Sequence, residues 1–350
     1  MMLPLLKWGN LALILASLAT LLAPYVHPEY FWPLSITGLF FPWLLLLHLA
    51  FIGFWLYQKN RYFLYSLGWL AISWNHFDSL VGVSTPDISP DGLSVLSLNC
   101  HGFFAPSTGK RPTPEEWESW ISANKEVDFL FFQEFPSNGR FSGAGAAVAK
   151  KEFARHWPHK YHKAGGRLAI WSKYPLSDKK VNYFSNHVNG IMQATATVNK
   201  QRIRLLNVHL QSNSITELSD EFVTDLDVPE KETLNKFVEM LRRYKNAAIQ
   251  RARQVKQLEE ILEDSSGSLV LGGDFNDTPQ SYAYQRIHSY LSDGFRQKGM
   301  GIGTTYQGKL PGLRIDYIFF SPDLFVESYR HQKTRFSDHK MVQTSFRWKE

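Results

Sequence analysis

Residues 1–83 carry long apolar runs that the remainder of the chain lacks. Three such runs cover residues 8–25, 34–57 and 62–80, and the second is almost free of charged side chains. A run of about 20 apolar residues can cross a bilayer as a helix, and aromatic residues flank the second run, as is typical at membrane surfaces. A cleavable signal peptide would account for the first run alone. The pattern therefore predicts a membrane region of two to three transmembrane helices.

Basic residues are placed unevenly around these runs. Lys7 precedes the first run, Lys59 and Arg61 separate the second from the third, and the loop at residues 27–33 has no Lys or Arg. The positive-inside rule places these basic residues in the cytoplasm. The rest of the chain lies outside the cytoplasm if the third run crosses the membrane, and inside if it does not. We favour the first arrangement, which predicts a multi-pass protein of the inner (cytoplasmic) membrane with an external, periplasmic domain.

Composition narrows the partners only slightly. The formal net charge is +6 and the isoelectric point is about 9.1, a mild basic excess that suits nucleic acid or lipid headgroups without requiring either. Cys100 is the only cysteine, which excludes an intramolecular disulfide and a zinc site built from cysteines. The apolar runs hold almost no ionisable residues, so they favour an anchor over a transport path. No protein partner can be inferred.

The pattern changes after residues 84–91, a polar, proline-containing linker that we take as the domain boundary. Residues 113–125 predict a helix with Thr113 as its N-cap, and residues 229–263 predict a long amphipathic helix that covers a sheet. Short apolar runs between the helices predict strands at residues 93–98, 128–132, 168–172, 202–208, 269–271, 314–320 and 341–346. The alternation places residues 92–350 in the α/β (α+β) class.

The most distinctive stretch follows the strand predicted at residues 269–271. A glycine pair at 272–273 is expected to end this strand and to let the backbone approach a ligand closely. Asp274 and Asn276 come next, on one side of the chain by alternation. A carboxylate beside a carboxamide suits a hard metal ion or a phosphate. The alternative is an ordinary turn after a strand, since Gly, Asp and Asn are common turn residues.

Polar side chains recur at the ends of the predicted strands. The ends of neighbouring strands converge at one edge of a sheet, so these side chains are expected to meet. Together they offer oxygen ligands for a divalent ion and two imidazoles for proton transfer. Direct attack by water is the simplest chemistry, because no hydroxyl or thiol stands beside a base of its own. The residues are Asn99, Glu134, His209, Asp274, Asn276, Asp316, Asp338 and His339.

The order of the motifs resembles the endonuclease/exonuclease/phosphatase superfamily, which includes deoxyribonuclease I, abasic-site endonucleases, neutral sphingomyelinases and inositol polyphosphate 5-phosphatases. The membrane region followed by this domain looks like the membrane-anchored bacterial members. The resemblance implies a four-layer α/β/β/α sandwich of the deoxyribonuclease I-like type over residues 92–350. The motifs are Ser-Leu-Asn at 97–99, Phe-Gln-Glu at 132–134, Asn-Val-His at 207–209, Gly-Asp-Phe-Asn at 273–276, Arg-Ile-Asp-Tyr at 314–317 and Ser-Asp-His at 337–339.

The resemblance also implies a metal site. Glu134 is in the position of the principal Mg²⁺ ligand, with Asn99 beside it, and Asp338 is in a position to add a contact; Mn²⁺ is the alternative ion. Abasic-site endonucleases have an acidic residue two positions after the first asparagine, where this chain has His101. That departure argues against a role in DNA repair.

Catalytic roles carry over in the same way. Asp274 would orient or activate the attacking water, and Asn276 would hydrogen-bond a phosphate oxygen. His339 is in the position of the essential histidine, as a base or as a charged phosphate clamp, and Asp316 would fix its tautomer. His209 corresponds to the histidine on the leaving-group side in deoxyribonuclease-like members.

The expected function is therefore a membrane-anchored, Mg²⁺-dependent phosphodiesterase that cleaves nucleic acid or a phospholipid headgroup. Two alternatives stay open, a phosphomonoesterase and a catalytically silent, membrane-tethered scaffold. The intact set of candidate metal and histidine positions argues against the scaffold. A nuclease would lose affinity steeply with salt because its phosphate contacts release counterions.

Overall fold

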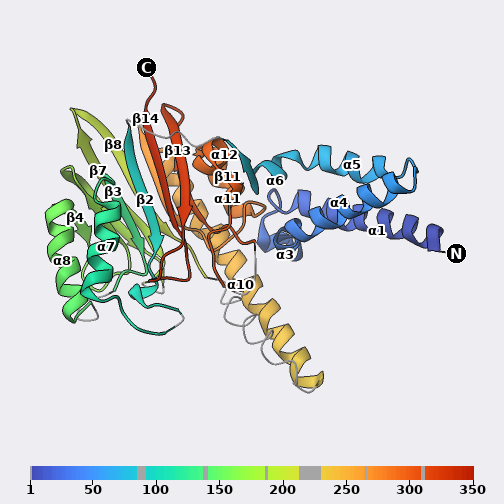
Figure 1. Cartoon of the computed structure of the whole chain (residues 1–350), viewed down its shortest axis with the longest axis horizontal. Coiled ribbons are helices and arrows are strands. Elements are labelled where there is room, and N and C mark those ends of the chain that lie inside the picture. Colours follow the sequence, from blue (N-terminus) through green and yellow to red (C-terminus); the bar gives the residue numbers. More distant parts are fainter. Residues whose placement is uncertain are drawn as a thin grey trace.

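The computed structural model describes residues 2–84, 92–106, 108–136, 141–185, 188–212, 230–264, 266–308 and 312–350 (Figure 1). It consists of a body built on two β-sheets and an N-terminal helical bundle that projects from one side of that body. Apart from Ser84, the predicted linker lies outside the described residues. The domain boundary there stays a prediction.

The body contains two six-stranded sheets, each with parallel and antiparallel neighbours. Across the first sheet the order is β10 (Ser292–Asp293), β12 (Asp316–Phe320), β9 (Leu269–Asp274), β8 (Gln201–His209), β7 (Gly190–Val198) and β6 (Leu176–Tyr183). Across the second sheet the order is β13 (Leu324–Gln332), β14 (Met341–Trp348), β2 (Leu93–Asn99), β3 (Phe129–Gln133), β5 (Ala169–Ser172) and β4 (His159–His162).

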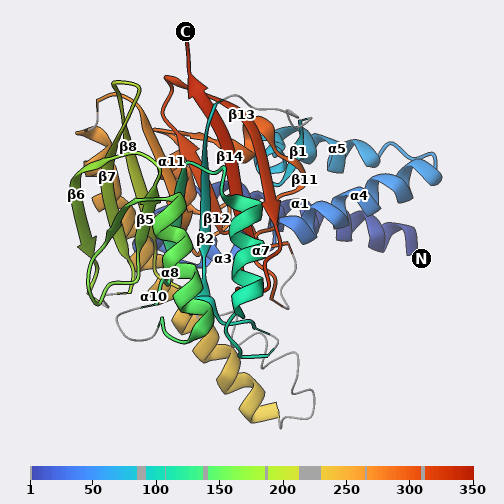
Figure 2. The same ribbon diagram turned by 60° about the vertical axis from the view of Figure 1, so that its left-hand side comes forward.

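Three buried clusters show that the sheets and helices form four layers. One cluster lies between the sheets and includes Phe131, Leu205 and Ile318. A second packs the outer face of the second sheet against α7 (Pro114–Asn124) and α8 (Ala144–His156), which lie side by side in Figure 2. A third packs the first sheet against α10 (Glu230–Glu263) and α11 (Tyr282–His288). The predicted α/β/β/α sandwich is thus confirmed.

Local sequence signals explain the two predicted helices. Thr113 Oγ1 accepts a hydrogen bond from the backbone of Glu116, and Glu116 Oε2 accepts one from the backbone of Thr113, which forms a capping box at the start of α7. The long helix α10 begins at Glu230, one residue after its predicted start. Its first part extends beyond the body (Figures 1 and 2).

The sequence predicted that the glycine pair ends its strand, and this prediction is wrong. Strand β9 continues through both glycines to Asp274. A Cβ on Gly273 would lie 1.9 Å from the carbonyl oxygen of Val208, and one on Gly272 would lie 2.8 Å from the ring of Phe131. The absent side chains therefore make room for the neighbouring strand and the core, and the close approach of the backbone to a ligand stays a prediction.

The N-terminal residues form six helices, which together make up the bundle. One helix, Leu3–Leu22, is long and apolar enough to cross a membrane, a property that membrane spans share with signal sequences. Helices α3 and α4 pass the same test only as a pair, and they are bent by 61°. The third predicted run is divided at Ser73 into two short helices. The helices are α1 (Met2–Leu22), α2 (Pro28–Phe31), α3 (Pro33–Leu39), α4 (Phe41–Tyr57), α5 (Phe63–Ile72) and α6 (Trp74–Asp78).

The bundle is joined to the body by specific contacts. Strand β1 (Val81–Val83) pairs antiparallel with β11 (Met300–Ile302), which follows α12 (Gly294–Lys298). Gln280 Nε2 donates to the backbone oxygen of His76 at 3.2 Å, which ties the loop after β9 to α6. The two parts are therefore packed directly against each other.

Candidate active site

Strand register brings candidate side chains to the same edge of the body. In the parallel pair β8–β9, His209 lies opposite Asp274. In the antiparallel pair β9–β12, Asp316 lies opposite Asp274. The parallel pair β2–β3 places Asn99 opposite Gln133, so Glu134 follows directly. The predicted convergence of strand ends is thus present in the structure.

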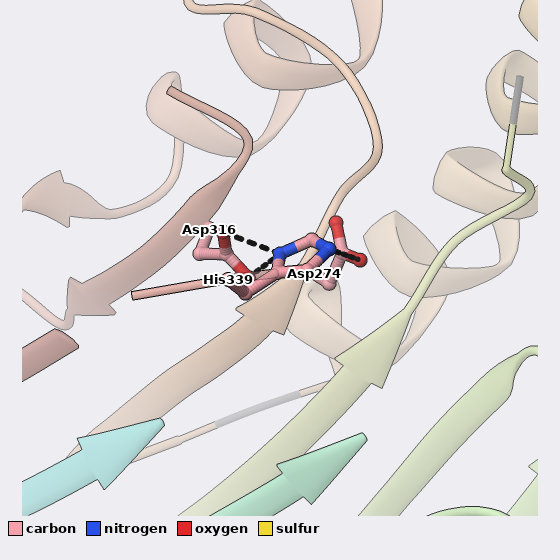
Figure 3. Close-up of side chains that lie close together, drawn as sticks. All are labelled: Asp274, Asp316 and His339. Carbon is pink, nitrogen blue, oxygen red and sulfur yellow. Dashed lines mark hydrogen bonds and ion pairs between the residues drawn. The ribbon is translucent and has the colours of Figure 1, made fainter. Parts of the chain in front are cut away.

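His339 lies between two buried carboxylates (Figure 3). Its Nδ1 is 3.0 Å from Asp316 Oδ2 and 3.1 Å from Oδ1, while its Nε2 is 3.9 Å from Asp274 Oδ2. The ring of Tyr306 packs edge-on against the imidazole, with centroids 5.4 Å apart. Asp316 therefore fixes the orientation of the ring and leaves Nε2 facing Asp274.

These charges shift one another's protonation. Burial alone would lower the pKa of His339, but Asp316 and Asp274 outweigh burial and raise the pKa to about 10. Burial and the charge of Asp316 raise the pKa of Asp274 to about 7. Without a metal ion, this site therefore holds a protonated imidazole beside a carboxyl group that titrates near neutral pH.

Asn99 connects the two sheets at this edge. Its Nδ2 donates to Glu134 Oε1 at 3.1 Å and to Asp274 Oδ2 at 2.9 Å. Glu134 has a positive φ of 51°, an uncommon conformation for a side chain of this size that is often found at functional sites. One buried amide thus fixes two carboxylates that lie on different sheets.

His209 is buried and faces both of these carboxylates. Its Nε2 is 3.9 Å from Glu134 Oε1 and 3.7 Å from Asp274 Oδ2. Neither ring nitrogen has a hydrogen-bond partner among the described residues. Burial lowers the pKa of His209 to about 4, so the ring is neutral at pH 7. A buried ring without partners is suited to contact a bound molecule.

Glu134 has further polar neighbours on its solvent side. His101 Nδ1 lies 3.7 Å from Glu134 Oε2 and 3.9 Å from Asp338 Oδ1, which places Asp338 near Glu134 through an imidazole. Arg167 Nη2 also lies 3.7 Å from Glu134 Oε2. The sequence offers Arg167 as a cleft-lining residue, with an edge-strand residue as the alternative, and marks His101 only as a departure from the abasic-site endonuclease pattern.

Asn276 lies beside this group in a conformation that strand alternation does not describe. Its φ is +53°, so the predicted alternation from Asp274 does not hold. Its backbone N–H donates to Asp274 Oδ1 at 2.8 Å, and its Nδ2 donates to the carbonyl oxygen of Leu210 at 3.0 Å. Phe275 points into the core as predicted. The amide of Asn276 is therefore close to Asp274 but already bonded on one side.

A buried amide pair beneath the site was missed as a structural element. Gln133 Nε2 donates to Asn207 Oδ1 at 2.7 Å, across the two sheets. Asn207 Nδ2 in turn donates to the carbonyl oxygens of Phe132 and Ala169, at 2.9 Å each. Polar residues inside otherwise apolar strands were the available signal. This pair fixes the spacing of the sheets one residue before Glu134 and two before His209.

Two sets of ligands could hold a divalent ion. Asp274, Asp316 and His339 each offer a ligand atom, all within 4.8 Å of one another. Asp316 and His339 are already paired, however, and a protonated imidazole repels a cation. Glu134 Oε2 lies 3.7 Å from both His101 Nδ1 and Arg167 Nη2, and Asn99 and Asp338 lie nearby. The carboxylates of Glu134 and Asp338 fit a hard divalent ion better. Asn99 faces Glu134 through its Nδ2–H, and its Oδ1 accepts from the backbone N–H of His101 at 3.1 Å.

Comparison with known proteins agrees with this geometry. The model of the endonuclease/exonuclease/phosphatase family matches residues 96–339, and a domain of unknown function matches residues 4–80. A search of curated proteins found no match.

Solved structures with similar folds cover the body. An endonuclease/exonuclease/phosphatase from Beutenbergia cavernae has 18% identity and a TM-score of 0.51, over 73% of this chain and 71% of that one. A family protein from Leptotrichia buccalis has 17% identity and a TM-score of 0.49, over 73% and 100%. Sphingomyelinase C from Streptomyces griseocarneus has 15% identity and a TM-score of 0.45, over 73% and 99%. At this identity, the first of these likenesses shows a shared fold.

Proposed function

Because the chain belongs to the endonuclease/exonuclease/phosphatase family, whose members hydrolyse phosphoester bonds, we propose that it is a membrane-anchored, Mg²⁺-dependent phosphodiesterase. The observation that carries this proposal is the position of Asp274, whose Oδ2 lies within 4 Å of polar atoms on Asn99, His209 and His339. Its substrate is a phosphodiester, in nucleic acid or in a phospholipid headgroup. A membrane anchor favours the lipid, because it keeps the enzyme beside the bilayer.

The metal site of this proposal is Glu134 with Asn99 and Asp338. Carboxylate and amide oxygens are the ligands that Mg²⁺ prefers, and Mn²⁺ accepts the same set. His209, Asn99 and His101 outweigh the effect of burial and hold the pKa of Glu134 below its usual value, so this carboxylate is ionised at neutral pH. When bound, the ion would neutralise charge that develops on the phosphoryl oxygens.

Proton transfer in this proposal starts at Asp274. A carboxylate with a pKa near the working pH is a suitable general base for an attacking water. His339, with a pKa of about 10, is charged at neutral pH, which supports the role of phosphate clamp over that of base. Asp316 holds the ring of His339 and balances its charge.

The remaining two residues act on the phosphate and on the leaving group. Neutral His209 can donate one ring N–H toward the leaving-group oxygen, since neither nitrogen is bonded within the described residues. Asn276 is bonded to Leu210 through its amide nitrogen. We assign its side-chain amide the binding of one phosphate oxygen.

The proposal of a membrane anchor rests on the surface of the bundle. Leucines on α1, α4 and α5 are exposed, among them Leu15 (63%), Leu46 (57%) and Leu64 (52%). Such a surface is unfavourable in water and suited to lipid. Helix α1 has 21 residues, roughly 30 Å at 1.5 Å per residue, which matches the hydrocarbon thickness of a bilayer.

The bundle also supports the predicted orientation. Lys7 Nζ lies 4.6 Å from the ring centroid of Tyr62, so the start of α1 and the loop before α5 share one end of the bundle. That end lies far from the body (Figure 1). It carries Lys59 and Arg61 as well, and the positive-inside rule places it in the cytoplasm. If the bundle crosses the membrane, the body at its opposite end lies on the external, periplasmic side.

Replacement of Glu134 by Gln tests the metal assignment. We expect Mg²⁺ to bind at least about tenfold more weakly, because a charged ligand is lost, and the concentration of Mg²⁺ for half-maximal activity to rise in parallel. Calorimetric titration of the full chain in detergent measures the binding directly. Glu126→Gln is the control, since the side chain of Glu126 is 89% exposed and is not among the candidate site residues. An unchanged Mg²⁺ affinity in Glu134→Gln would remove this residue from the metal site.

A further inference from the structure

A groove opens at the end of the bundle that lies far from the body. It lies between the first half of α1 and the start of α5, and its volume is about 300 Å³. One end is lined by Lys7 with Pro4, Trp8, Tyr62 and Tyr65, the middle by Asn10, and the other end by Leu11 and Ile14. The groove is therefore polar at one end and apolar at the other.

The polar end offers an amide donor without a partner in the described part of the chain and a lysine whose ammonium lies over the ring of Tyr62. Lys7 forms no ion pair with any residue in the described part of the chain. Asn10 is only 1% exposed, and its Nδ2 has no partner there either. A buried amide donor without a partner is unfavourable. A bound molecule that brings an acceptor to Asn10 and a negative charge to Lys7 would satisfy both groups.

Asn10 is held in place by a chain of hydrogen bonds that crosses the bundle. Ser66 Oγ donates to Asn10 Oδ1 at 2.9 Å, and His48 Nδ1 lies 3.0 Å from Ser66 Oγ. His48 Nε2 lies 3.0 Å from Ser17 Oγ, and its ring stacks on Trp69 with centroids 3.9 Å apart. The free N–H of Asn10 is thus fixed before any ligand binds, which lowers the entropy cost of binding.

The spacing along α1 matches the parts of a phospholipid. Lys7, Asn10 or Leu11, and Ile14 are one turn apart, so they lie on one face of the helix. Asn10 lies roughly 4.5 Å deeper than Lys7 at 1.5 Å per residue. An ammonium at the mouth, an amide donor one turn below and apolar side chains beyond correspond to a phosphate, an ester carbonyl and an acyl chain.

We infer that this groove binds one phospholipid with an anionic headgroup. The inference rests on the membrane placement proposed above and is independent of catalysis. The headgroup phosphate pairs with Lys7, the ester carbonyl accepts from Asn10, and an acyl chain lies along Leu11 and Ile14. Anionic lipids are favoured because this end of the bundle has no acidic residue. Glu29 is the first acidic residue of the chain and Asp78 is the next. A zwitterionic headgroup would find no carboxylate for its cation at this end.

Native mass spectrometry of the full chain in mild detergent tests this site. Phosphatidylglycerol and phosphatidylcholine are added at equal concentration. We expect the protein to retain one phosphatidylglycerol in preference to phosphatidylcholine, and Lys7→Gln and Asn10→Leu each to weaken retention about tenfold or more. Lys59→Gln is the matched control, because Lys59 is a basic residue of the same end that does not line the groove. Lys7→Gln changes a side chain at the groove mouth and keeps the test valid if Asn10→Leu misfolds.

Three outcomes would overturn the inference. They are equal retention of the two lipids, wild-type retention in Lys7→Gln, and an equal loss in Lys59→Gln. Release of the chain from membranes by alkaline carbonate would overturn the membrane placement itself, and the lipid site with it. Phosphodiesterase activity of the same preparations reports on catalysis separately, so the failure of one proposal can be distinguished from the failure of the other.

Discussion

His339, Asp316 and Asp274 place one imidazole and two carboxyl groups in a small buried volume. Asp316 raises the pKa of both of the other groups, because its negative charge stabilises a protonated imidazole and opposes ionisation of Asp274. The protonation of the site is therefore set jointly by the three residues. A change at Asp316 is expected to alter the pH dependence of catalysis, and not its rate alone.

The first prediction concerns that pH dependence. If Asp274 is the base, kcat/KM should rise about tenfold per pH unit below the pKa of Asp274, which is about 7 without a metal ion, and then level off. Asp316→Asn should lower the rate by about 10²- to 10⁴-fold and move the rising limb to lower pH, because the charge that raises the pKa of Asp274 is gone. A rate that stays constant from pH 5 to 8 in the unaltered protein would contradict the role of Asp274.

The second prediction concerns a buried ion pair away from the site. Asp293 Oδ2 lies 2.6 Å from Arg314 Nη2 and accepts from Tyr284 Oη at 2.7 Å, while Oδ1 accepts from the backbone of Phe295. Asp293→Asn should destabilise the protein by about 3–5 kcal/mol, because it leaves the guanidinium of Arg314 buried and unpaired. Thermal unfolding followed by tryptophan fluorescence measures the change. Asp264→Asn, at an exposed position, is the control.

The same pair sets a direction for stability against pH. Burial would raise the pKa of Asp293, but Arg314 outweighs it and holds the pKa below its usual value. A carboxyl whose pKa is lower in the folded state stabilises the fold above the unfolded-state pKa of about 3.9 and loses that contribution as pH falls through the folded-state pKa. The melting temperature of the unaltered protein should therefore fall more steeply below pH 4 than that of Asp293→Asn. Parallel curves would contradict this account.

Sequence patterns predicted which residues gather at the site better than they predicted the contacts between those residues. Asn99, Glu134, His209 and Asp274 meet as expected, because parallel strands end at one edge. Asp338 reaches Glu134 by way of His101, a contact that the sequence motifs did not predict. The left-handed backbone at Asn276 was not predictable either, because strand alternation says nothing about residues after the strand ends.

At the scale of elements, the two sheets are tied together beneath the site by Asn207. This side chain makes hydrogen bonds to Gln133 on β3 and to the backbones of β3 and β5. Glu134 directly follows β3 and His209 is the last residue of β8, so the spacing of the sheets also sets the spacing of these two candidate residues.

The third prediction follows from this link. Asn207→Ala should cost at least about 3 kcal/mol, because one buried donor and two buried carbonyl groups lose their partner. It should also lower kcat, because the spacing of Glu134 and His209 is no longer fixed. Thermal unfolding and steady-state kinetics measure the two effects. Thr197→Ala, at an exposed position on β7, should change neither by much. Full activity in Asn207→Ala would show that the link is not needed for catalysis.

Central strands were predictable and edge strands were not. Strands β2, β3 and β9 are buried on both faces, and their apolar runs stand out in the sequence. Strands β4 and β6 lie at sheet edges and expose most of their side chains at least partly, so no apolar pattern marks them. Strand β7 was not predicted either, although its apolar residues would have allowed the prediction.

At the scale of the whole molecule, the bundle rests on the loop that follows the candidate active site. A Cβ on Gly38 of α3 would lie 2.9 Å from the carbonyl oxygen of Gln280, a few residues after Asp274. Tyr244 of α10 donates to the carbonyl oxygen of Ser35 at 2.6 Å. These contacts join residues more than 200 positions apart, so hydrophobic patterning could not reveal them.

The fourth prediction tests this junction. Gly38→Ala should destabilise the protein by about 1–3 kcal/mol, because the added methyl group forces α3 away from Gln280. Gly53→Ala is the matched control, since a Cβ there meets no atom within 4 Å and alanine favours the helix. Limited proteolysis and thermal unfolding compare the two. Equal stability of both variants would mean that the junction is not tightly packed.

The fifth prediction concerns the side of the membrane on which the body lies. Protease added to intact spheroplasts should digest the body if the body lies outside the cytoplasm, as proposed above. The physical reason for this orientation is that the end of the bundle with the basic residues is expected to lie in the cytoplasm. Full protection of the body, with digestion after the membrane is permeabilised, would reverse the orientation.

The central claim is metal-dependent hydrolysis of a phosphodiester at Asp274, and one assay tests it most directly. The full chain and its Asp274→Ala variant, both in detergent, are assayed with Mg²⁺ and with a chelator against a chromogenic phosphodiester, duplex DNA and a choline phospholipid. We predict turnover with Mg²⁺ that the chelator abolishes and that Asp274→Ala lowers by at least about 10²-fold. The natural substrate that is cleaved then decides between nuclease and lipid esterase. Folded protein that turns over none of the three substrates, or equal turnover in the variant, would contradict the proposed function.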